Sequence, residues 1–469
     1  MLSQRGKLPI DSVSSIEERE GGLSRSVSVR QMAMIAIGSS IGTGLFLGSG
    51  IAIAYAGPAV LISYVIAAFV AMVMMVSLTE MTIVHASAGS FGAQAEYYVG
   101  SLAGYVTRYT YWAAQVLAIG GEATAIALYM SLWYPQVPGS VWVASAAAGL
   151  LALNLINVRN FGWAEYVFTA IKVTAIIVFI LLGLYIILRG YGGVHLFQNL
   201  YAHGGFMPHG WAGVWMAVLM AIFSFYGIEV VAITAGETTE PKRNIPRAFR
   251  LQYVRLVVFY FGALFVMLSI TPWNQTGAVE VSQSPFILSL RALHLPLATG
   301  AFNFVIIIAA ISSMNADLYV SSRMLFSLSR SGLAPSMFGK LLERSRVPLY
   351  AVLASSAGMV VALGLNMVTP AAFNILFGIS IFGGLVVWIM ILITFLAYRR
   401  HEDYHRRIVF RAPFSPWLQY GGIAVLSAIL ITMALSNTWR FAWYAGAPFI
   451  AIICVIYVFS QKQRGGLVR

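Results

Sequence analysis

The sequence predicts an all-α integral membrane protein, and three observations support this class. Of the 469 residues, 59% are hydrophobic and only 10% are charged, whereas about a quarter of a soluble globular chain is charged. The mean hydropathy is +0.81. The apolar residues gather in about twelve runs, each long enough to cross a bilayer core of about 30 Å as a helix. The single cysteine, Cys454, excludes a disulfide framework or a cysteine-based metal cluster.

The apolar runs divide the chain into a core and an accessory part. We expect spans near residues 31–56, 59–86, 103–133, 139–158, 162–188, 211–236, 251–271, 297–328, 349–368, 371–398, 418–436 and 440–460. Residues 31–398 are expected to form a ten-helix transport core of two halves, about 31–188 and 211–398. Residues 418–460 supply the two accessory helices.

The two ends are polar, and the basic residues orient the chain. Residues 1–30 are Ser-rich and of mixed charge, so we expect a mostly disordered cytoplasmic tail without a signal peptide, and residues 461–469 form a second tail. With the amino terminus inside, 25 of the 29 lysines and arginines fall inside, Lys172 lies within a span, and three lie outside, at Arg189, Arg291 and Arg440. This distribution predicts that both termini are cytoplasmic. Loop orientation also explains the net charge of +13, and we expect no nucleic acid partner.

Two expected spans are interrupted by glycine at corresponding places. The first span carries Gly42 and Gly44 in its middle, and the sixth carries Gly227 beside aromatic residues and an acid. These spans open the two halves of five, and such a pair of interruptions points to an inverted-repeat transporter with its site at the breaks. A second interpretation stays open, because Gly44 and Gly48 form a Gly-x-x-x-Gly pattern that allows close helix packing.

Broken helices at these places are complementary to a zwitterion. Unwinding a helix in lipid frees NH and CO groups, each of which costs several kcal/mol unless a partner satisfies it. A half-helix that begins near Thr43 presents NH groups and the positive end of its dipole, which suit a carboxylate. A half-helix that ends near Ser224–Tyr226 presents carbonyl groups, which suit an ammonium. The commonest zwitterion that a cell imports is an α-amino acid, so the breaks indicate an amino acid site.

Six stretches resemble the bacterial amino acid permeases. They are Met34–Gly50, Ser87–Gly92, Gly121–Ala125, Ile171–Val173, Gly236–Ala248 and Ser322–Phe326. In order and spacing they are similar to the amino acid transporter family of the amino acid/polyamine/organocation superfamily, from about residue 20 to about residue 460. The resemblance implies a twelve-helix LeuT-type fold, location in the bacterial inner membrane, and import by proton symport with alternating access.

The resemblance also implies which residues meet the substrate. The segment that binds the α-carboxylate is formed by Ser40, Ile41, Gly42, Thr43 and Gly44. The α-amino group would meet the carbonyl groups of the sixth span, at Phe223, Ser224 and Tyr226, next to Gly227. Tyr226 is bulkier than the glycine that several family members carry there, which bears on the side-chain preference. We expect a neutral L-amino acid; the alternatives are a cationic amino acid or polyamine carrier, which needs acids such as Glu122 in its pocket, and an amino acid exchanger.

Ionisable residues inside the membrane need a reason, because each costs at least ~2.5 kcal/mol at the centre of a span. Lys172 lies roughly 15 Å deep in its span, too deep to snorkel easily, and the resemblance places it beside the first broken helix, where sodium-coupled relatives hold an ion. Glu122 lies in the middle of span three, where a helix-to-helix hydrogen bond is its alternative role. We expect Lys172 or Glu122 to carry the coupled proton. Weaker candidates are Glu80, Glu229 and Asp317, the last of which is explained by an ion pair with Arg323.

Other classes of function find little support in the sequence. An intramembrane enzyme is disfavoured because the chain has no HExxH motif and only short polar loops. A channel should show rings of charge or filter-like repeats, and none is visible. His195, His203 and His209 are read as solvated loop residues, so we expect neither a metal nor a cofactor. The expected partners are the amino acid substrate, the proton and membrane lipid.

Overall fold

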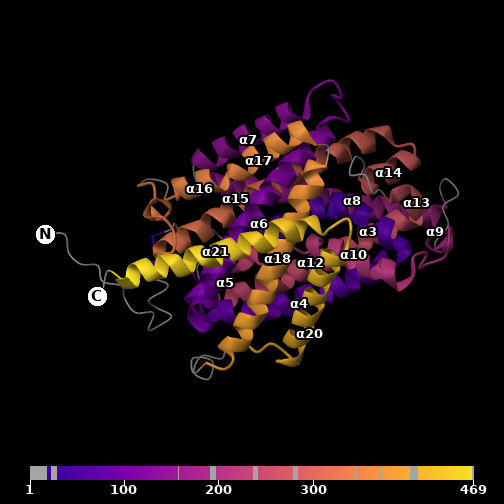
Figure 1. Ribbon diagram of the computed structural model, residues 1–469. Coiled ribbons are helices and arrows are strands. Elements are labelled where there is room, and N and C mark those ends of the chain that lie inside the picture. The colour runs from indigo at the N-terminus through magenta and orange to yellow at the C-terminus, as the bar shows by residue number, and fades with distance from the viewer. Residues whose placement is uncertain are drawn as a thin grey trace.

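The computed structural model describes residues 18–22, 29–156, 158–190, 197–235, 241–277, 284–343, 346–369, 371–401 and 410–466. Across these residues the chain is helical and contains no strand. Figure 1 shows the helices packed side by side into one bundle. The all-α class predicted from the sequence is confirmed for this part of the chain.

The first half of the chain contributes α2 (Val29–Ser40), η1 (Gly44–Gly48), α3 (Ser49–Ala56), η2 (Gly57–Ala59), α4 (Val60–Val84), α5 (Ser90–Tyr98), α6 (Ser101–Met130), α7 (Gly139–Ile156) and α8 (Val158–Arg189). The second half contributes α9 (Gln198–Tyr201), α10 (Gly210–Ser224), α11 (Val230–Thr234), α12 (Pro241–Ile270), α13 (Trp273–Thr276), α14 (Pro285–Ala292), α15 (Pro296–Arg330), η5 (Ser336–Gly339), α16 (Leu349–Ser355), α17 (Ala357–Val368) and α18 (Ala372–Tyr398). The chain continues with α20 (Trp417–Leu435) and α21 (Phe441–Gly466).

Among the described residues, nine helical stretches are long and apolar enough to cross a membrane. One of them, Ile37–Val84, is 48 residues long and includes both of the first two expected spans. Expected spans four and six are present as shorter apolar helices, Gly139–Leu153 and Gly210–Ser224. The chain is therefore a multi-pass membrane protein.

Both expected interruptions are present in the helices. Helix α2 ends at Ser40, Ile41 and Gly42 are not helical, and the chain then continues as the π-helical turn η1. Helix α10 ends at Ser224, and residues 225–229 form turns before α11 begins. Gly227 has φ +91°, a left-handed conformation that glycine adopts without steric cost. A Cβ at Gly227 would lie 2.6 Å from the carbonyl oxygen of Ser39, so the two broken segments approach each other closely here.

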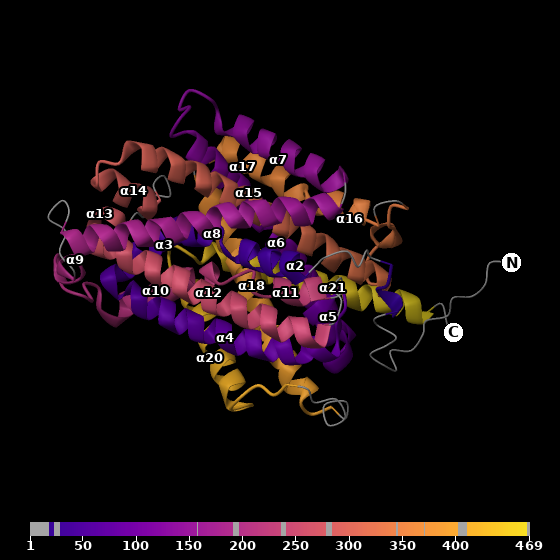
Figure 2. The ribbon, with the colours of Figure 1, turned by 180° about the vertical axis from the view of Figure 1, so that it is seen from behind.

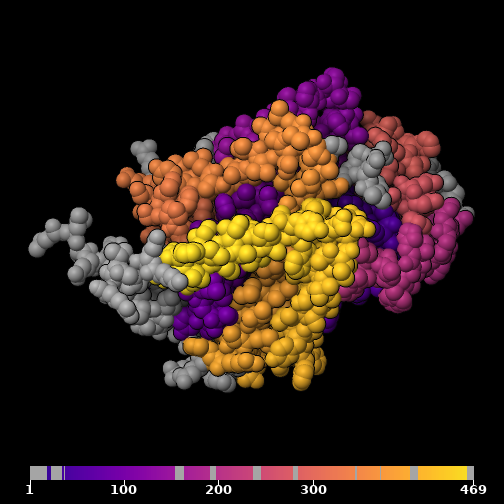
Figure 3. All heavy atoms as spheres, in the orientation of Figure 1, coloured from indigo at the N-terminus to yellow at the C-terminus, as the bar shows by residue number. Residues whose placement is uncertain are grey.

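Helix α6 lies at the centre of the bundle and packs against α15 and α18. Helix α8 packs against α2 and α15, and α10 packs against α3 and α4. Figures 1 and 2 place α9, α13 and α14 at one end of the bundle, and α5, α16 and the end of α21 at the other. The space-filling view in Figure 3 shows α20 and α21 lying over the outside of the molecule.

The structure corrects three of the expected boundaries. Helix α12 begins at Pro241, ten residues before the expected start at 251. Its first turns are polar and basic, so they did not count as part of an apolar run, whereas proline is favourable at the first position of a helix. The ninth span is divided at Ser356 into α16 and α17. Helix α21 continues to Gly466, through most of the expected tail 461–469, of which 467–469 lie outside the described residues.

Part of the N-terminal tail packs against the body, contrary to the expectation of a disordered segment. Glu20 is only 4% exposed and accepts a hydrogen bond from the backbone NH of Gly89 at 2.7 Å. Arg19 forms an ion pair with Glu96 at 3.2 Å, and Arg108 is fully buried against Glu96 and Glu20. Buried charges need such partners, which is why this segment is held in place. Residues 1–17 and 23–28 lie outside the described residues.

Candidate functional site

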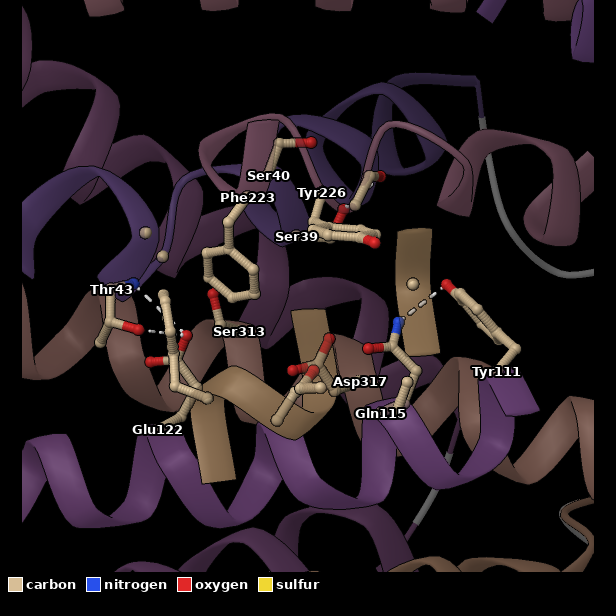
Figure 4. A pocket seen from close by; sticks show the side chains of 18 residues that line it. Ser39, Ser40, Thr43, Tyr111, Gln115, Glu122, Phe223, Tyr226, Ser313 and Asp317 are labelled. Atoms are coloured by element: carbon tan, nitrogen blue, oxygen red, sulfur yellow. Dashed lines mark hydrogen bonds between the residues drawn. The ribbon is translucent and has the colours of Figure 1, made fainter. Parts of the chain in front are cut away.

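A pocket lies between the two helix breaks and the central helices α6, α15 and α18 (Figure 4). The expected site residues that line it are Ser40, Gly42, Thr43, Gly44, Glu122, Phe223, Tyr226 and Gly227. The remaining lining residues are Ser39, Tyr111, Ala114, Gln115, Ala118, Ser313, Asp317, Phe377, Ser380 and Gly384. Ile41, Ser224 and Lys172 are buried next to this pocket without lining it. The structure thus brings segments more than 300 residues apart in the chain to one cavity.

Hydrogen bonds join the two broken segments directly. The hydroxyl of Ser39 donates to the carbonyl oxygen of Gly227 at 3.0 Å. The hydroxyl of Tyr260, on α12, lies 2.6 Å from the carbonyl oxygen of Ser40 and 2.5 Å from that of Ser224. The single hydrogen of this hydroxyl is therefore shared between two carbonyl groups, one from each break, in an apolar environment where an unpaired carbonyl is costly. The sequence did not indicate Tyr260, because a tyrosine within an apolar span is an ordinary core residue.

Ser224 takes part through its side chain as well as its backbone. Its hydroxyl lies 3.1 Å from the carbonyl oxygen of Gly44 and 2.8 Å from the hydroxyl of Tyr64. The carbonyl of Phe223 accepts a hydrogen bond from the NH of Tyr226 at 2.9 Å. In this conformation, two of the carbonyl groups that the sequence assigned to the substrate amino group are therefore engaged within the protein.

Glu122 contacts the segment that the sequence assigned to the substrate carboxylate. Its Oε1 accepts hydrogen bonds from the backbone NH of Thr43 at 3.3 Å and from the hydroxyl of Thr43 at 2.9 Å. Its other oxygen, Oε2, has no hydrogen-bond partner among the described residues. Thr43 lies at the start of η1, where NH groups favour a negative charge. The same position therefore attracts both this carboxylate and the carboxylate of a ligand.

Lys172 holds the end of the first half-helix. Its ammonium donates to the carbonyl oxygens of Gly38 and Ile41, the latter at 2.9 Å, and the side chain is fully buried. These carbonyls form the negative end of α2, which a cation stabilises. Lys172 therefore stabilises the broken end of α2 without lining the pocket.

Glu165 completes this buried network, and the sequence analysis did not identify it as a functional candidate. Its carboxylate accepts hydrogen bonds from Ser312 and from the amide of Asn315, the latter at 3.2 Å, which joins α8 to α15. Glu165 precedes Lys172 by seven residues, so the two lie on one face of the helix. That spacing was the available signal, but Glu165, near the start of the expected span 162–188, was given no role.

The other acids within the apolar helices have different surroundings. Glu80 accepts hydrogen bonds from Arg399 at 2.7 Å and from the NH of Ala412 at 2.5 Å, so it anchors the segment before α20. Glu229 accepts hydrogen bonds from the hydroxyl of Tyr111 at 3.2 Å and from the NH of Gly227 at 3.3 Å. This acid therefore supports the break in the sixth span.

The expected ion pair between Asp317 and Arg323 is wrong. Asp317 faces the pocket, whereas the guanidinium of Arg323 stacks over the ring of Tyr319 at 3.7 Å. The two residues are six apart on α15, about 600° around a helix of 3.6 residues per turn, so their side chains leave it on different faces.

Aromatic rings form one wall of the pocket. The ring centroids of Phe223 and Phe377 are 3.9 Å apart, and those of Phe223 and Tyr226 are 5.4 Å apart. The hydroxyl of Tyr226 reaches the carbonyl oxygen of Ile381 at 3.3 Å and occupies the space that a Cβ at Gly384 would need. Tyr226 and Gly384 thus fit together and set the width of the pocket.

The histidines of the loop before α10 do not form a metal site in the described part of the chain. His203 and His209 are exposed, His195 lies outside the described residues, and the described residues hold no group of three histidines, cysteines or acids able to bind a metal ion. The nearby stretch Gly236–Glu240, part of one of the six resembling stretches, also lies outside the described residues.

Comparisons with known proteins place this chain among transport proteins. A family model for amino acid permeases matches residues 31–465. The uncharacterized amino acid permease YtnA of Bacillus subtilis is 36% identical over 448 residues, 94% of this chain and 96% of YtnA. The aromatic amino acid transport protein AroP of Escherichia coli is 34% identical over 446 residues, again 94% and 96% of the two chains. A crystal structure of the Eremococcus coleocola manganese transporter has a similar fold, with a TM-score of 0.59 at 13% identity over 98% of this chain and 97% of that one.

Proposed function

The chain belongs to the amino acid permease family, and from that premise we propose that it imports L-amino acids across a bacterial inner membrane by proton symport. The family and the relatives are transporters, so the protein is a multi-pass amino acid permease and not an enzyme. Proton coupling, the direction of transport and the side-chain preference are the parts that we add.

The observation that carries the proposal is the pocket between the two helix breaks. Thr43 presents its NH and its hydroxyl at the start of η1, which suits the α-carboxylate. The residues proposed for the substrate are Ser40, Ile41, Gly42, Thr43 and Gly44 on the first broken segment and Phe223, Ser224, Tyr226 and Gly227 on the sixth. Because the two segments are tied to each other at Gly227 and Ser39, a movement of one shifts the other, as alternating access requires.

We propose that twelve spans form this permease, in two inverted halves of five followed by two accessory helices. The long stretch Ile37–Val84 turns at Gly57, which has φ +60°, so it supports a count of two spans. The shorter helices at Gly139–Leu153 and Gly210–Ser224 supply the fourth span and part of the sixth. The basic loops favour a cytoplasmic location of both termini.

For the coupled proton we propose Lys172, with Glu122 as the alternative. Charged, Lys172 ties the end of α2 to the bundle through Gly38 and Ile41; neutral, it releases that end and allows the inner side to open. Glu122 instead contacts the substrate segment itself. Either group changes its interactions with the first span when it gains or loses a proton, which is what coupling to a conformational change needs.

Two side-chain classes are candidates for the substrate. The aromatic wall of Phe223, Tyr226 and Phe377 fits the neutral amino acid expected from the sequence, and AroP is named for aromatic amino acids. A cationic amino acid needs an acid at the far end of the pocket. Asp317, which faces the pocket, supplies one, so this second candidate also has a specific observation in its favour.

A binding and counterflow experiment tests the proposed function. The purified protein is screened by thermal shift against the twenty amino acids, and proteoliposomes loaded with a stabilising amino acid are then tested for uptake of the labelled compound. We expect at least one amino acid to stabilise the protein and to show trans-stimulation, which a channel does not show. Gly44→Leu should abolish both signals, because a Cβ there already approaches the ring of Phe223 to 2.8 Å. Gly149→Leu is the control, because Gly149 is exposed on α7 and no atom lies within 4 Å of an added Cβ. If neither the wild type nor Gly149→Leu binds any amino acid, the proposal is contradicted.

A further inference from the structure

Asp317 is a buried acid in the pocket that takes no part in the proposed proton coupling. Its side chain is 9% exposed and lines the pocket, and it makes no hydrogen bond or ion pair with any residue in the described ranges. It lies one helical turn beyond Ser313 on α15, whose hydroxyl also lacks a hydrogen-bond partner among those residues. Figure 4 shows both side chains directed into the cavity. An ionisable group at this depth indicates a function.

The surroundings of Asp317 add a second hydrogen-bond acceptor. The amide nitrogen of Gln115 donates to the hydroxyl of Tyr111 at 2.7 Å, and that hydroxyl donates in turn to Glu229 at 3.2 Å. Because the amide nitrogen of Gln115 is directed at the hydroxyl of Tyr111, its amide oxygen is turned toward Asp317 (Figure 4). This end of the pocket therefore presents acceptors, which favour a donor and above all a positively charged one.

The charges around the pocket favour a cation in the ligand. The charged residues among its lining are Glu122 and Asp317, both acids, and no lysine or arginine lines it. The ammonium of Lys172 is directed at the carbonyl groups of Gly38 and Ile41, and two further acids, Glu165 and Glu229, are buried behind the lining. A ligand with an additional positive charge reduces the repulsion within this group and gains a charge-assisted hydrogen bond.

The position of Asp317 relative to the first break fits a side-chain group. A Cβ at Gly42 would contact the hydroxyl of Ser313, so Ser313 lies at the level of the carboxylate-binding segment. Asp317 follows four residues later, about 6 Å along the helix axis, which matches the reach of a long aliphatic side chain beyond its Cα. The rings of Phe223 and Tyr226 line the same pocket and lie next to each other, so they can cover an aliphatic stem.

We propose that Asp317 and Gln115 form a subsite for a cationic group on the substrate side chain, so that this permease takes amino acids that carry a side-chain amine or guanidine. The inference rests on the proposed function, since the same pocket must bind the α-carboxylate and the α-amino group. The carboxylate of Asp317 makes the charge-assisted contact, and the amide oxygen of Gln115 accepts a second hydrogen bond from the same group.

The test compares charged substrates with uncharged analogues of similar shape. Binding of L-lysine against L-norleucine, and of L-arginine against L-citrulline, is measured on the purified wild type and on Asp317→Asn, Asp317→Glu and Glu343→Gln, which changes an exposed acid outside the pocket. We expect the wild type to bind the charged member of each pair at least tenfold more tightly. Asp317→Asn should lower this ratio by roughly tenfold to a hundredfold, whereas Asp317→Glu and the matched acid-to-amide control Glu343→Gln should keep the preference.

The outcomes separate this subsite from the function on which it rests. A wild-type ratio near one, or an unchanged ratio in Asp317→Asn, overturns the subsite. If neutral amino acids bind and exchange without any preference for lysine or arginine, the permease function stands and the subsite is refuted; if no amino acid binds, both fail. If Asp317→Asn binds no amino acid, the result for Asp317→Glu is decisive. A retained preference of this variant for the charged amino acids supports the subsite, and loss of that preference overturns it. Loss of pH-driven uptake with an unchanged ratio makes Asp317 a proton carrier and overturns the subsite.

Discussion

The ammonium of Lys172 donates a hydrogen bond to the carbonyl oxygen of Ile41 at 2.9 Å, at the residue where the first half-helix has ended. A second bond reaches the carbonyl of Gly38. One side chain of α8 thus satisfies carbonyl groups that the break would otherwise leave unpaired, at a cost of several kcal/mol each in an apolar environment. The conformation of the broken first segment and the charge on Lys172 are therefore linked.

Glu122 should make amino acid binding depend on pH. Its carboxylate holds the NH and the hydroxyl of Thr43, so a substrate carboxylate must compete with it. A proton on Glu122 removes that competition; we therefore expect wild-type affinity to rise as the pH falls. The facing charged groups that also bear on this effect are Asp317 on α15 and Lys172 on α8.

The variant Glu122→Gln tests this dependence, because it keeps the shape of the protonated acid. We expect its affinity at pH 8 to resemble that of the wild type at low pH, and to vary little with pH in a thermal-shift titration. The control is Glu343→Gln, which makes the same change at an exposed position outside the pocket. An unaltered pH profile in Glu122→Gln would assign Glu122 to helix packing.

Gly227→Val should prevent substrate binding while the protein still inserts. Valine is strained at the φ of +91° found here, by roughly 1–2 kcal/mol for the backbone alone, and its Cβ would lie 2.6 Å from the carbonyl of Ser39. The matched control is Gly421→Val, at an exposed position of α20 with no atom within 4 Å of the added Cβ. Thermal-shift binding curves of both variants check this, and equal binding would show that the sixth break tolerates a side chain.

Much of the fold was predictable from the sequence, because apolar runs and glycine breaks are local features. The breaks after Ser40 and Ser224 follow from the residues themselves. The partners of the breaks were harder to predict: Tyr260 bridges both broken segments, yet nothing in its neighbourhood in the sequence distinguishes it. Asp317 was assigned to Arg323 because sequence distance was the only guide, whereas helix geometry directs it into the pocket.

Tyr226 and Gly384 should together set the size of side chain that the pocket accepts. Because the hydroxyl of Tyr226 fills the space beside Gly384, Tyr226→Gly opens room and should shift the preference toward larger side chains within a panel of amino acids of one charge. Gly384→Ala should instead displace the ring of Tyr226 into the cavity and weaken the binding of all of them. Competition for uptake in proteoliposomes measures both, and an unchanged size order in Tyr226→Gly would place this ring outside the substrate path.

The contacts of the N-terminal segment should weaken in acid. Burial by itself raises the pKa of the Glu96 carboxyl, but the guanidiniums of Arg108 and Arg19 outweigh it, and the pKa is held below its ordinary value of 4.5. The stabilisation is therefore fully present above pH 4.5 and is lost as the pH falls through the lower folded-state pKa. Glu96→Gln should lower the unfolding temperature at pH 7, because it leaves buried Arg108 short of a counter-charge, and its deficit should shrink at acid pH. A deficit that is independent of pH would contradict this account.

Accumulation of a labelled amino acid in proteoliposomes, with and without an imposed pH gradient, tests the central claim most directly. The amino acid used is one that stabilises the purified protein. We expect the wild type to concentrate it when the outside is acidic, and Lys172→Ala to lose this accumulation while retaining some exchange, since the substrate contacts come largely from the backbone. The exposed Lys340→Ala is the control. If the wild type accumulates the amino acid equally with and without the pH gradient, proton symport is contradicted. If Lys172→Ala still accumulates it and Glu122→Gln does not, the coupled proton is carried by Glu122 on α6 and not by Lys172 on α8.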